Sequence, residues 1–138
     1  PINEFGSKKQ KDKYLPDLIN GKKIGCFGLT ESEAGSDPSS MKTTYRKTKD
    51  GYILNGSKNW ITNAPIADVF IIWALEENKD HKSIEGFILE KNLNGLKTSA
   101  IENKTSLRIS PTGQIILNDV LVPKDSRLKN TNGSLKLS

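Results

Sequence analysis

The spacing of apolar residues changes once along the chain, near Ile24. Before that point, Ser7 and Gln10 form the pattern of a capping box, which predicts that a helix begins there. Gly21 is suited to end the helix, and Pro16 favours a kink within it. Apolar residues in this segment recur at intervals of three and four, so they share one helix face: Tyr14, Leu15, Leu18 and Ile19. The chain is therefore predicted to open with a short amphipathic helix.

After Ile24 the chain consists of short runs rich in β-forming residues and separated by turn residues, as in all-β domains. The predicted strands are Ile24–Leu29, Lys42–Thr48, Tyr52–Leu54, Ser57–Thr62, Val69–Leu75, Gly86–Glu90, Ser99–Ile101 and Gly113–Leu117. Asp50-Gly51 and Asn55-Gly56 are the strongest turn signals, because both pairs tolerate the positive φ of tight hairpins. The polar run Glu76–Lys82 is expected to be an exposed hairpin loop. The pattern predicts a mainly β fold, an antiparallel β-sandwich or barrel with a short N-terminal helical segment.

Composition narrows the class of protein. The chain has 138 residues, enough for one domain, and 34% of them are hydrophobic, enough for a core. Its longest apolar run, Val69–Leu75, is far shorter than the ~20 residues that cross a bilayer. The net charge of +5 includes 18 Lys and only three Arg. Because Arg is the preferred reader of base edges, this excess disfavours a nucleic-acid partner and suits a small polyanion, such as a coenzyme that carries phosphates.

Several kinds of chemistry are disfavoured by the residues present. No nucleophile, histidine and carboxylate stand in a recognisable catalytic pattern, and no cysteine–histidine cluster has the spacing of metal ligands. The single histidine, His81, lies in a charged run and is expected to be solvated. The single cysteine, Cys26, lies on an apolar strand and is expected to be a small core residue without a disulfide. Hydrolase and zinc chemistry are therefore not expected.

The segment Gly25–Met41 leaves a predicted strand and enters a long loop of small residues. Gly28, Ala34 and Gly35 carry little or no side chain, so backbone N–H groups there can approach a flat or anionic ligand closely. Hydroxyl groups along the loop can donate to ligand oxygen or nitrogen atoms: Thr30, Ser36, Ser39 and Ser40. Taken alone, the segment is also compatible with an ordinary Gly/Ser-rich loop.

A second segment, Asn55–Asn63, is predicted to be a tight turn that leads into an alternating strand. Alternation places Trp60 and Thr62 on the same side of that strand. An aromatic plane beside a hydroxyl could form a wall for a planar heterocycle and bond to its edge. The alternative is that Trp60 belongs to the core and Thr62 is an ordinary strand residue.

In this order, the two segments resemble the middle β-domain of the acyl-CoA dehydrogenases. The stretches that fit the signature of the family are Gly28–Glu31, Ala34–Asp37 with Ser40, and Lys58–Asn63. Within the family, the chain is most similar to glutaryl-CoA dehydrogenase at Gly25–Glu31, Gly35–Met41 and Ser106–Arg108. Ser32 departs from the family pattern, which usually has proline after the Thr-Glu pair. The resemblance implies a fold and a cofactor that the residues alone leave open.

The implied cofactor is FAD. One segment is expected to wrap the flavin and its phosphate-bearing chain, through Phe27, Gly28, Leu29, Thr30, Glu31, Ser32, Glu33, Ala34, Gly35 and Ser36. Trp60, Ile61 and Thr62 are expected beside the ring, and Ser36 is also expected to contact the coenzyme arm of the acyl-CoA thioester. Donors from the loop backbone, Thr30 and Thr62 would stabilise negative charge on the pyrimidine edge of the reduced ring.

The resemblance further implies α,β-dehydrogenation of an acyl-CoA, with glutaryl-CoA favoured and decarboxylation to crotonyl-CoA following. Electrons would pass to an electron-transfer flavoprotein. The family takes its glutamate base from a C-terminal helical domain, so no residue here, including Glu31, Glu33 and Asp37, is expected to be catalytic. The isolated chain is expected to be inactive. The alternatives are a non-catalytic binding or assembly module and a domain of an acyl-CoA oxidase.

The implied domain organisation divides the chain into three parts. Residues 1–21 are expected to end an N-terminal helical domain, 22–128 to form the middle β-domain, and 129–138 to be a linker towards a C-terminal helical domain. The single methionine, Met41, indicates a fragment or a processed product. The complete protein is expected to be a homotetramer, in the mitochondrial matrix of a eukaryote or the cytoplasm of a bacterium.

Overall fold

The computed structural model describes residues 1–77 and 84–129. Helices α1 (Ile2–Phe5) and α2 (Lys8–Ile19) precede the strands. The predicted capping box is confirmed, because the backbone N–H of Gln10 donates to Ser7 Oγ over 3.2 Å and the Ser7 N–H donates to Gln10 Oε1 over 2.8 Å. Pro16 lies inside α2 without ending it. The predicted apolar face is wrong at Ile19, whose side chain points to solvent with 79% of its surface exposed.

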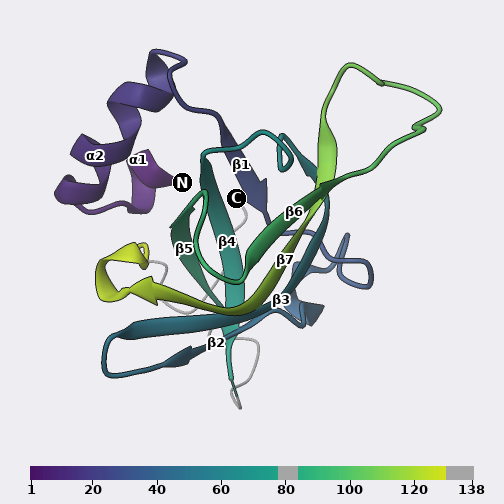
Figure 1. Ribbon diagram of the computed structural model, residues 1–138. Helices are drawn as coiled ribbons and strands as arrows, with labels where there is room; N and C mark the ends of the chain where they lie inside the picture. The colour runs from purple at the N-terminus through teal and green to yellow at the C-terminus, as the bar shows by residue number, and fades with distance from the viewer. Residues whose placement is uncertain (78–83, 130–138) are drawn as a thin grey trace.

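The strands form one curled, seven-stranded sheet (Figure 1). They are β1 (Gly25–Gly28), β2 (Thr44–Lys47), β3 (Gly51–Thr62), β4 (Val69–Glu76), β5 (Ile84–Glu90), β6 (Leu96–Ala100) and β7 (Thr112–Pro123). The predicted mainly β architecture is confirmed, with one difference in pairing. The strands β1 and β2 both run parallel to β4, whereas the other pairings are antiparallel. Because β5 occupies one edge of β4, β1 and β2 share the opposite edge.

The predicted turn at Asn55-Gly56 is wrong, and the two strands predicted on either side of it form the single strand β3. Gly56 has a φ of +139° within the strand, where the register with β7 shifts. A Cβ at Gly56 would lie 2.6 Å from Thr43 Oγ1. Glycine is therefore required here by a β-bulge and a close approach. The chain does reverse at Lys49 and Asp50, between β2 and β3.

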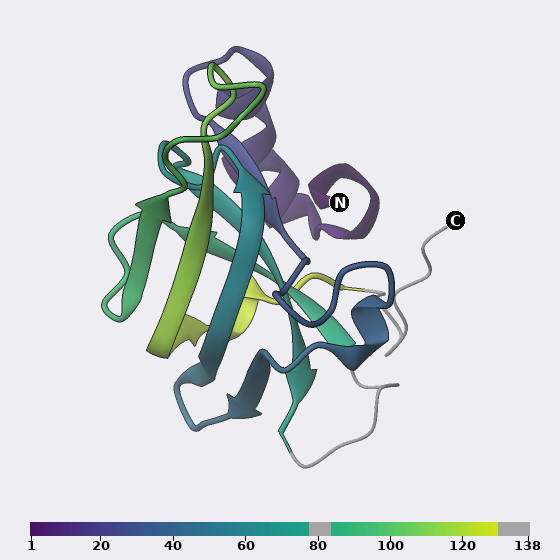
Figure 2. The same ribbon diagram turned by 90° about the vertical axis from the view of Figure 1, so that its right-hand side faces the viewer.

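The two faces of the sheet carry separate apolar clusters. Along β4, Phe70 and Ile72 point into the curled sheet, whereas Ile71 and Trp73 point towards the other face. Helices α1 and α2 and part of the β1–β2 loop cover that second face (Figure 2). The prediction for Cys26 is confirmed: it is 7% exposed, and burial raises the pKa of its thiol to about 12. The two clusters thus hold β1, β3 and the loop between β1 and β2 in fixed positions.

Some expectations fall outside the described residues. Most of the predicted loop Glu76–Lys82, together with His81, and all of the predicted linker except Lys129 belong to 78–83 and 130–138. Within the described ranges, no helix has the length and apolar character needed to cross a membrane. The same ranges contain no cluster of three or more side chains suited to hold a metal ion.

Candidate functional site

The loop between β1 and β2 leaves and rejoins the same edge of β4. Near its start, the backbones of Glu31 and Ala34 exchange hydrogen bonds of 3.1 and 3.2 Å around a turn at Ser32 and Glu33. Further along, the Asp37 carboxylate accepts from the Ser39 N–H over 3.0 Å and starts the short 3₁₀ helix η1 (Pro38–Ser40). The small residues therefore form a shaped loop with its own hydrogen bonds.

A buried ion pair joins this loop to β3. Lys58 Nζ donates to Glu31 Oε1 over 2.8 Å, and the two side chains are 0% and 9% exposed. Burial alone would raise the pKa of the Glu31 carboxyl, but hydrogen bonds from Lys58, Thr43 and Lys42 outweigh burial and hold that pKa below its ordinary value. Burial lowers the pKa of Lys58, and the Glu31 carboxylate offsets part of this effect. The Glu31 side chain is thus held inside the protein.

The two segments singled out in the sequence meet beside this pair. The backbone N–H of Asn59 donates to the carbonyl oxygen of Thr30 over 2.9 Å, and its side-chain amide donates to Ser32 Oγ over 3.3 Å. Trp60 follows directly, in the left-handed region with φ of +61°, where the register with β7 shifts again. The aromatic residue is therefore presented at the edge of the glycine-containing loop.

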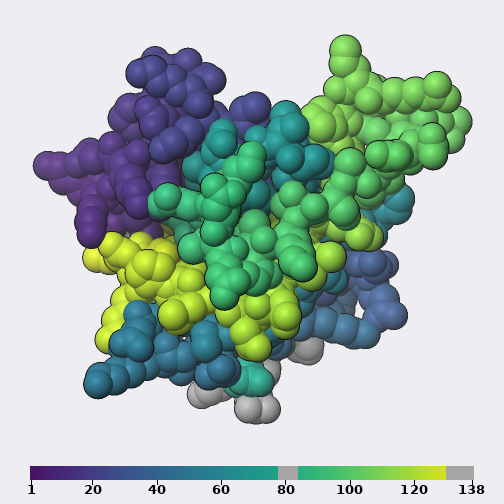
Figure 3. All heavy atoms as spheres, viewed as in Figure 1, coloured from purple at the N-terminus to yellow at the C-terminus, as the bar shows by residue number. Residues whose placement is uncertain are grey.

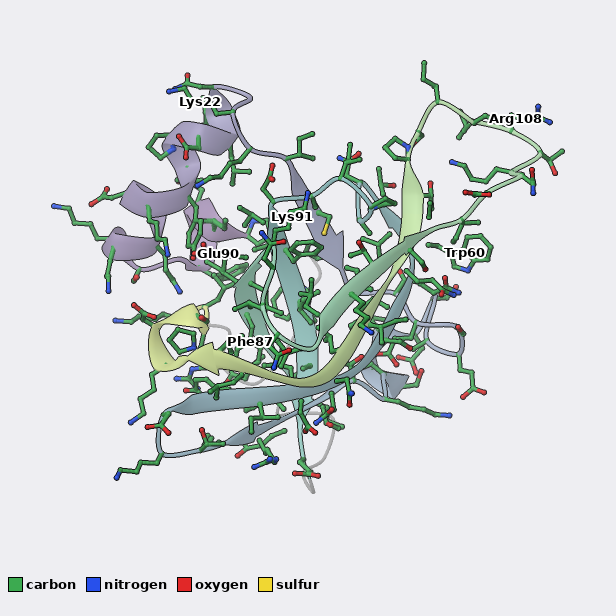
Figure 4. All side chains as sticks on the ribbon, in the orientation of Figure 1. Lys22, Trp60, Phe87, Glu90, Lys91 and Arg108 are labelled. Carbon is green, nitrogen blue, oxygen red and sulfur yellow. The ribbon has the colours of Figure 1, made fainter. Side chains whose placement is uncertain are left out.

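Trp60 is not a core residue. Its side chain is 59% exposed and lies at the surface of the molecule (Figure 4). Thr62 is exposed as well, while Ile61 between them is buried, so the predicted alternation around Ile61 is confirmed. The alternative interpretation of Trp60 as part of the core is wrong. An exposed tryptophan in strained backbone is a feature that folding alone does not explain.

Thr62 and Phe27 line the same groove, which has a cavity volume of about 470 Å³. The groove runs between β1, the end of β3 and helices α1 and α2; its other lining residues include Leu15, Leu18, Cys26 and Ile71. The Phe27 ring is 42% exposed and meets Trp73 edge-on, with ring centroids 6.3 Å apart. Phe27 thus has a packed side and a free side.

The remaining predicted site residues differ in what they can offer a ligand. Ser32, Glu33, Gly35 and Ser36 are exposed, Leu29 and Thr30 are half-buried, and Gly28, Glu31 and Ala34 are buried. A Cβ at Gly28 would lie 2.6 Å from Ile72 Cδ1, so packing explains this glycine. A Cβ at Gly35 would meet nothing within 4 Å. Within the described part of the chain, the N–H groups of Gly35 and Ser36 make no hydrogen bond.

Lys58 and Asn59 were not identified from the sequence as residues that build the site. A lysine in a strand is normally expected to point to solvent. The loop from Ile101 to Pro111 borders the end of β3, where the Asn63 N–H donates to the carbonyl oxygen of Pro111 over 2.8 Å. It projects from one corner of the molecule and carries Arg108 (Figures 3 and 4).

Comparison with known proteins identifies the family. Residues 26–120 match the family model described as the middle domain of acyl-CoA dehydrogenase. The short-chain specific acyl-CoA dehydrogenase of Clostridium acetobutylicum is 41% identical over 128 residues, which are 92% of this chain and 34% of that protein. The L-prolyl-[peptidyl-carrier protein] dehydrogenase of a Serratia species is 44% identical over 130 residues, 93% of this chain and 33% of that protein.

A solved structure shows the same fold. The structure of a glutaryl-CoA dehydrogenase from Mycobacterium smegmatis in complex with FADH2 superposes with a TM-score of 0.88 and 41% identity, over 93% of this chain and 32% of that one. The chain thus spans about a third of the length of these relatives. With the family model covering most of the β-sheet, the chain belongs to the acyl-CoA dehydrogenase family, in which it corresponds to the middle domain.

Proposed function

We propose that the chain is the FAD-binding middle domain of an acyl-CoA dehydrogenase. The observation that carries the proposal is the placement of the exposed Trp60 beside a loop whose exposed Gly35 and Ser36 make no hydrogen bond through their N–H groups within the described residues. A planar ring needs a flat wall, and the phosphates of a dinucleotide need unpaired N–H donors. The residues present therefore fit FAD. The comparison with the FADH2 complex of a relative supports the same cofactor.

Six of the predicted site residues have distinct tasks in this proposal. Trp60 and Phe27 offer aromatic surfaces, while the hydroxyls of Thr30 and Thr62 donate to the polar edge of the ring. Ile61 is buried and contributes backbone only. Ser36, exposed in the middle of the loop, contacts the coenzyme arm of the thioester. Bound FAD would accept the hydride that leaves the substrate.

The carboxylates of the loop are unsuited to be the catalytic base. Glu31 is buried and bonded to Lys58, and those bonds keep the pKa of its carboxyl below its ordinary value. Glu33 is exposed and paired with Lys42, and Asp37 accepts a hydrogen bond from Ser39. A general base must be free to take a proton and needs a pKa near the working pH. We infer that the base comes from another part of the complete enzyme and that this chain alone is inactive.

The finer assignment concerns the substrate. The stretches Gly25–Glu31, Gly35–Met41 and Ser106–Arg108 favour glutaryl-CoA, with decarboxylation to crotonyl-CoA and electron transfer to an electron-transfer flavoprotein. Relatives of similar identity are named for short-chain acyl-CoA and for a prolyl group on a carrier protein. In the proposed complete enzyme, a homotetramer, residues 1–21 belong to an N-terminal helical domain.

The experiment uses the product of the complete reading frame. Its visible absorption spectrum is recorded before and after anaerobic addition of glutaryl-CoA, butyryl-CoA or a prolyl thioester on a carrier protein. We expect a flavin spectrum that glutaryl-CoA bleaches fastest. Faster bleaching by either other thioester would overturn the glutaryl-CoA assignment and leave the family intact. A protein that stays colourless with added FAD would contradict the cofactor assignment.

A further inference from the structure

Lys58 is the most deeply buried charged side chain among the described residues. Its side chain is 0% exposed, and only Glu31 accompanies it as a buried charged residue in the described ranges. Besides Glu31, Lys58 Nζ donates to the carbonyl oxygen of Leu29 over 3.1 Å and lies 3.9 Å from Met41 Sδ. One ammonium group from β3 therefore contacts both ends of the β1–β2 loop.

The Glu31 carboxylate closes the same loop from the inside. Its Oε2 accepts from the Lys42 N–H over 2.6 Å, and its Oε1 accepts from the Thr43 N–H over 3.0 Å. The start and the end of the loop are thereby joined through one side chain. Lys58 bonds to both Glu31 and Leu29. The two ends of the loop are therefore linked to each other through Glu31 and to β3 through Lys58.

The same strand also fixes the direction of the loop backbone. Lys58 Nζ binds the Leu29 carbonyl, and the N–H of the next residue, Asn59, binds the Thr30 carbonyl over 2.9 Å. Two successive peptide groups are thus oriented by two successive residues of β3, immediately before Trp60. These two bonds connect the position of the loop to that of the strand end that carries Trp60.

A buried ion pair is a poor source of stability, because the desolvation of two charges offsets their attraction, and an apolar pair of similar volume is often as stable. The pair nevertheless restricts the geometry of the loop, because a buried polar atom that loses its hydrogen-bond partner costs free energy. We propose that Lys58 and Glu31 are positioning residues, which hold the loop in its ligand-binding shape before FAD arrives without touching FAD themselves. The claim that the ordered loop binds FAD rests on the proposed function. The claim that the ion pair orders the loop does not.

The test uses the product of the complete reading frame, freed of flavin, in four forms: wild type, Lys58→Met, Glu31→Gln and the double variant. Lys47→Met is the matched control, because Lys47 pairs with Glu76 at an exposed site. Three quantities are measured: hydrogen exchange of peptides covering 29–43 and β4, the dissociation constant of FAD, and the denaturant midpoint. If Lys58→Met does not fold, the same three measurements on Glu31→Gln still test the role of the pair.

We expect both single variants to speed exchange in 29–43 and to weaken FAD binding by about tenfold or more, because bonds to a buried charge are lost. The double variant should regain the denaturant midpoint, since no unpaired charge remains, but not the loop protection or the FAD affinity. Lys47→Met should match the wild type in all three. If FAD affinity returns together with the midpoint, or if loop exchange is unchanged in the single variants, the positioning role is wrong. If the wild type fails to bind FAD, the proposed function falls, and loop exchange alone still decides the role of the pair.

Discussion

The backbone N–H of Asn59 donates to the carbonyl oxygen of Thr30 over 2.9 Å. This bond joins a loop that follows β1 to the end of β3, two parts of the chain that are far apart in sequence. It sets the exposed Trp60 next to the glycine-containing loop. Because a backbone hydrogen bond places these two segments side by side, substitutions of exposed side chains can separate the folding of the candidate site from its binding.

Trp60 and Trp73 should be distinguishable by fluorescence. Trp60 is 59% exposed and Trp73 is 4% exposed. Iodide should quench part of the wild-type emission, and Trp60→Phe should remove that part with a change in the free energy of unfolding of less than about 0.5 kcal/mol, as for other surface substitutions. FAD should quench the same component. Quenching by iodide that persists in Trp60→Phe would show that the ring is not exposed.

Two glycines should respond to alanine in opposite ways. Gly56→Ala should lower the free energy of unfolding by at least about 1–3 kcal/mol, because its φ is +139° and a Cβ would meet Thr43. Gly35→Ala should leave the free energy of unfolding nearly unchanged, because a Cβ there meets nothing within 4 Å, yet it should weaken FAD binding. Denaturant unfolding and a flavin titration measure both. Unchanged FAD affinity in Gly35→Ala would remove Gly35 from the site.

Ser32→Pro should stabilise the protein. Ser32 opens the turn between Glu31 and Ala34, and its N–H makes no hydrogen bond within the described residues. Proline suits this turn position, and it reduces the entropy of the unfolded chain by the equivalent of ~0.4–1 kcal/mol. The hydrogen bond from Asn59 to Ser32 Oγ is lost, but it is exposed and 3.3 Å long. A lower melting temperature for Ser32→Pro would mean that the turn does not have the geometry seen here.

Stability should fall in acid partly through Glu31. The pKa of its carboxyl is below the ordinary 4.5 in the folded protein. A lowered pKa means that the stabilising contribution is complete above 4.5 and is lost as the pH falls through the folded pKa. Glu31→Gln should thus be less stable at neutral pH and lose less stability between about pH 5 and 3. Free energies of unfolding across this range test it; parallel curves for the two proteins would contradict the pairing with Lys58.

Local chemistry explains which features were predictable from the sequence. The capping box of Ser7 and Gln10, the buried run of β4 and the inert Cys26 each depend on nearby residues alone, and all are confirmed. Gly56 was misassigned because a positive φ serves a bulge as well as a turn. The parallel pairing of β1 and β2 with β4 was missed because side-chain alternation does not specify the partner strand.

In the candidate site, the sequence pointed to Trp60 but did not identify the buried ion pair of Lys58 and Glu31. Trp60 was singled out as a wall for a planar ring, which stays a prediction, and the bulge and positive φ at this residue are not specified by alternation. Lys58 was missed because its buried carboxylate partner, Glu31, lies in a distant loop. Long-range partners of this kind become visible only when the fold is known.

The most direct test of the proposed site is a hydrogen-exchange map of the complete protein with and without FAD. The account predicts that FAD slows exchange in peptides covering Phe27–Ser36 and Trp60–Thr62, and leaves the reversal at Lys49 and Asp50, at the other end of β3, unchanged. Slowed exchange confined to other parts of the chain, with no change in these two segments, would contradict it.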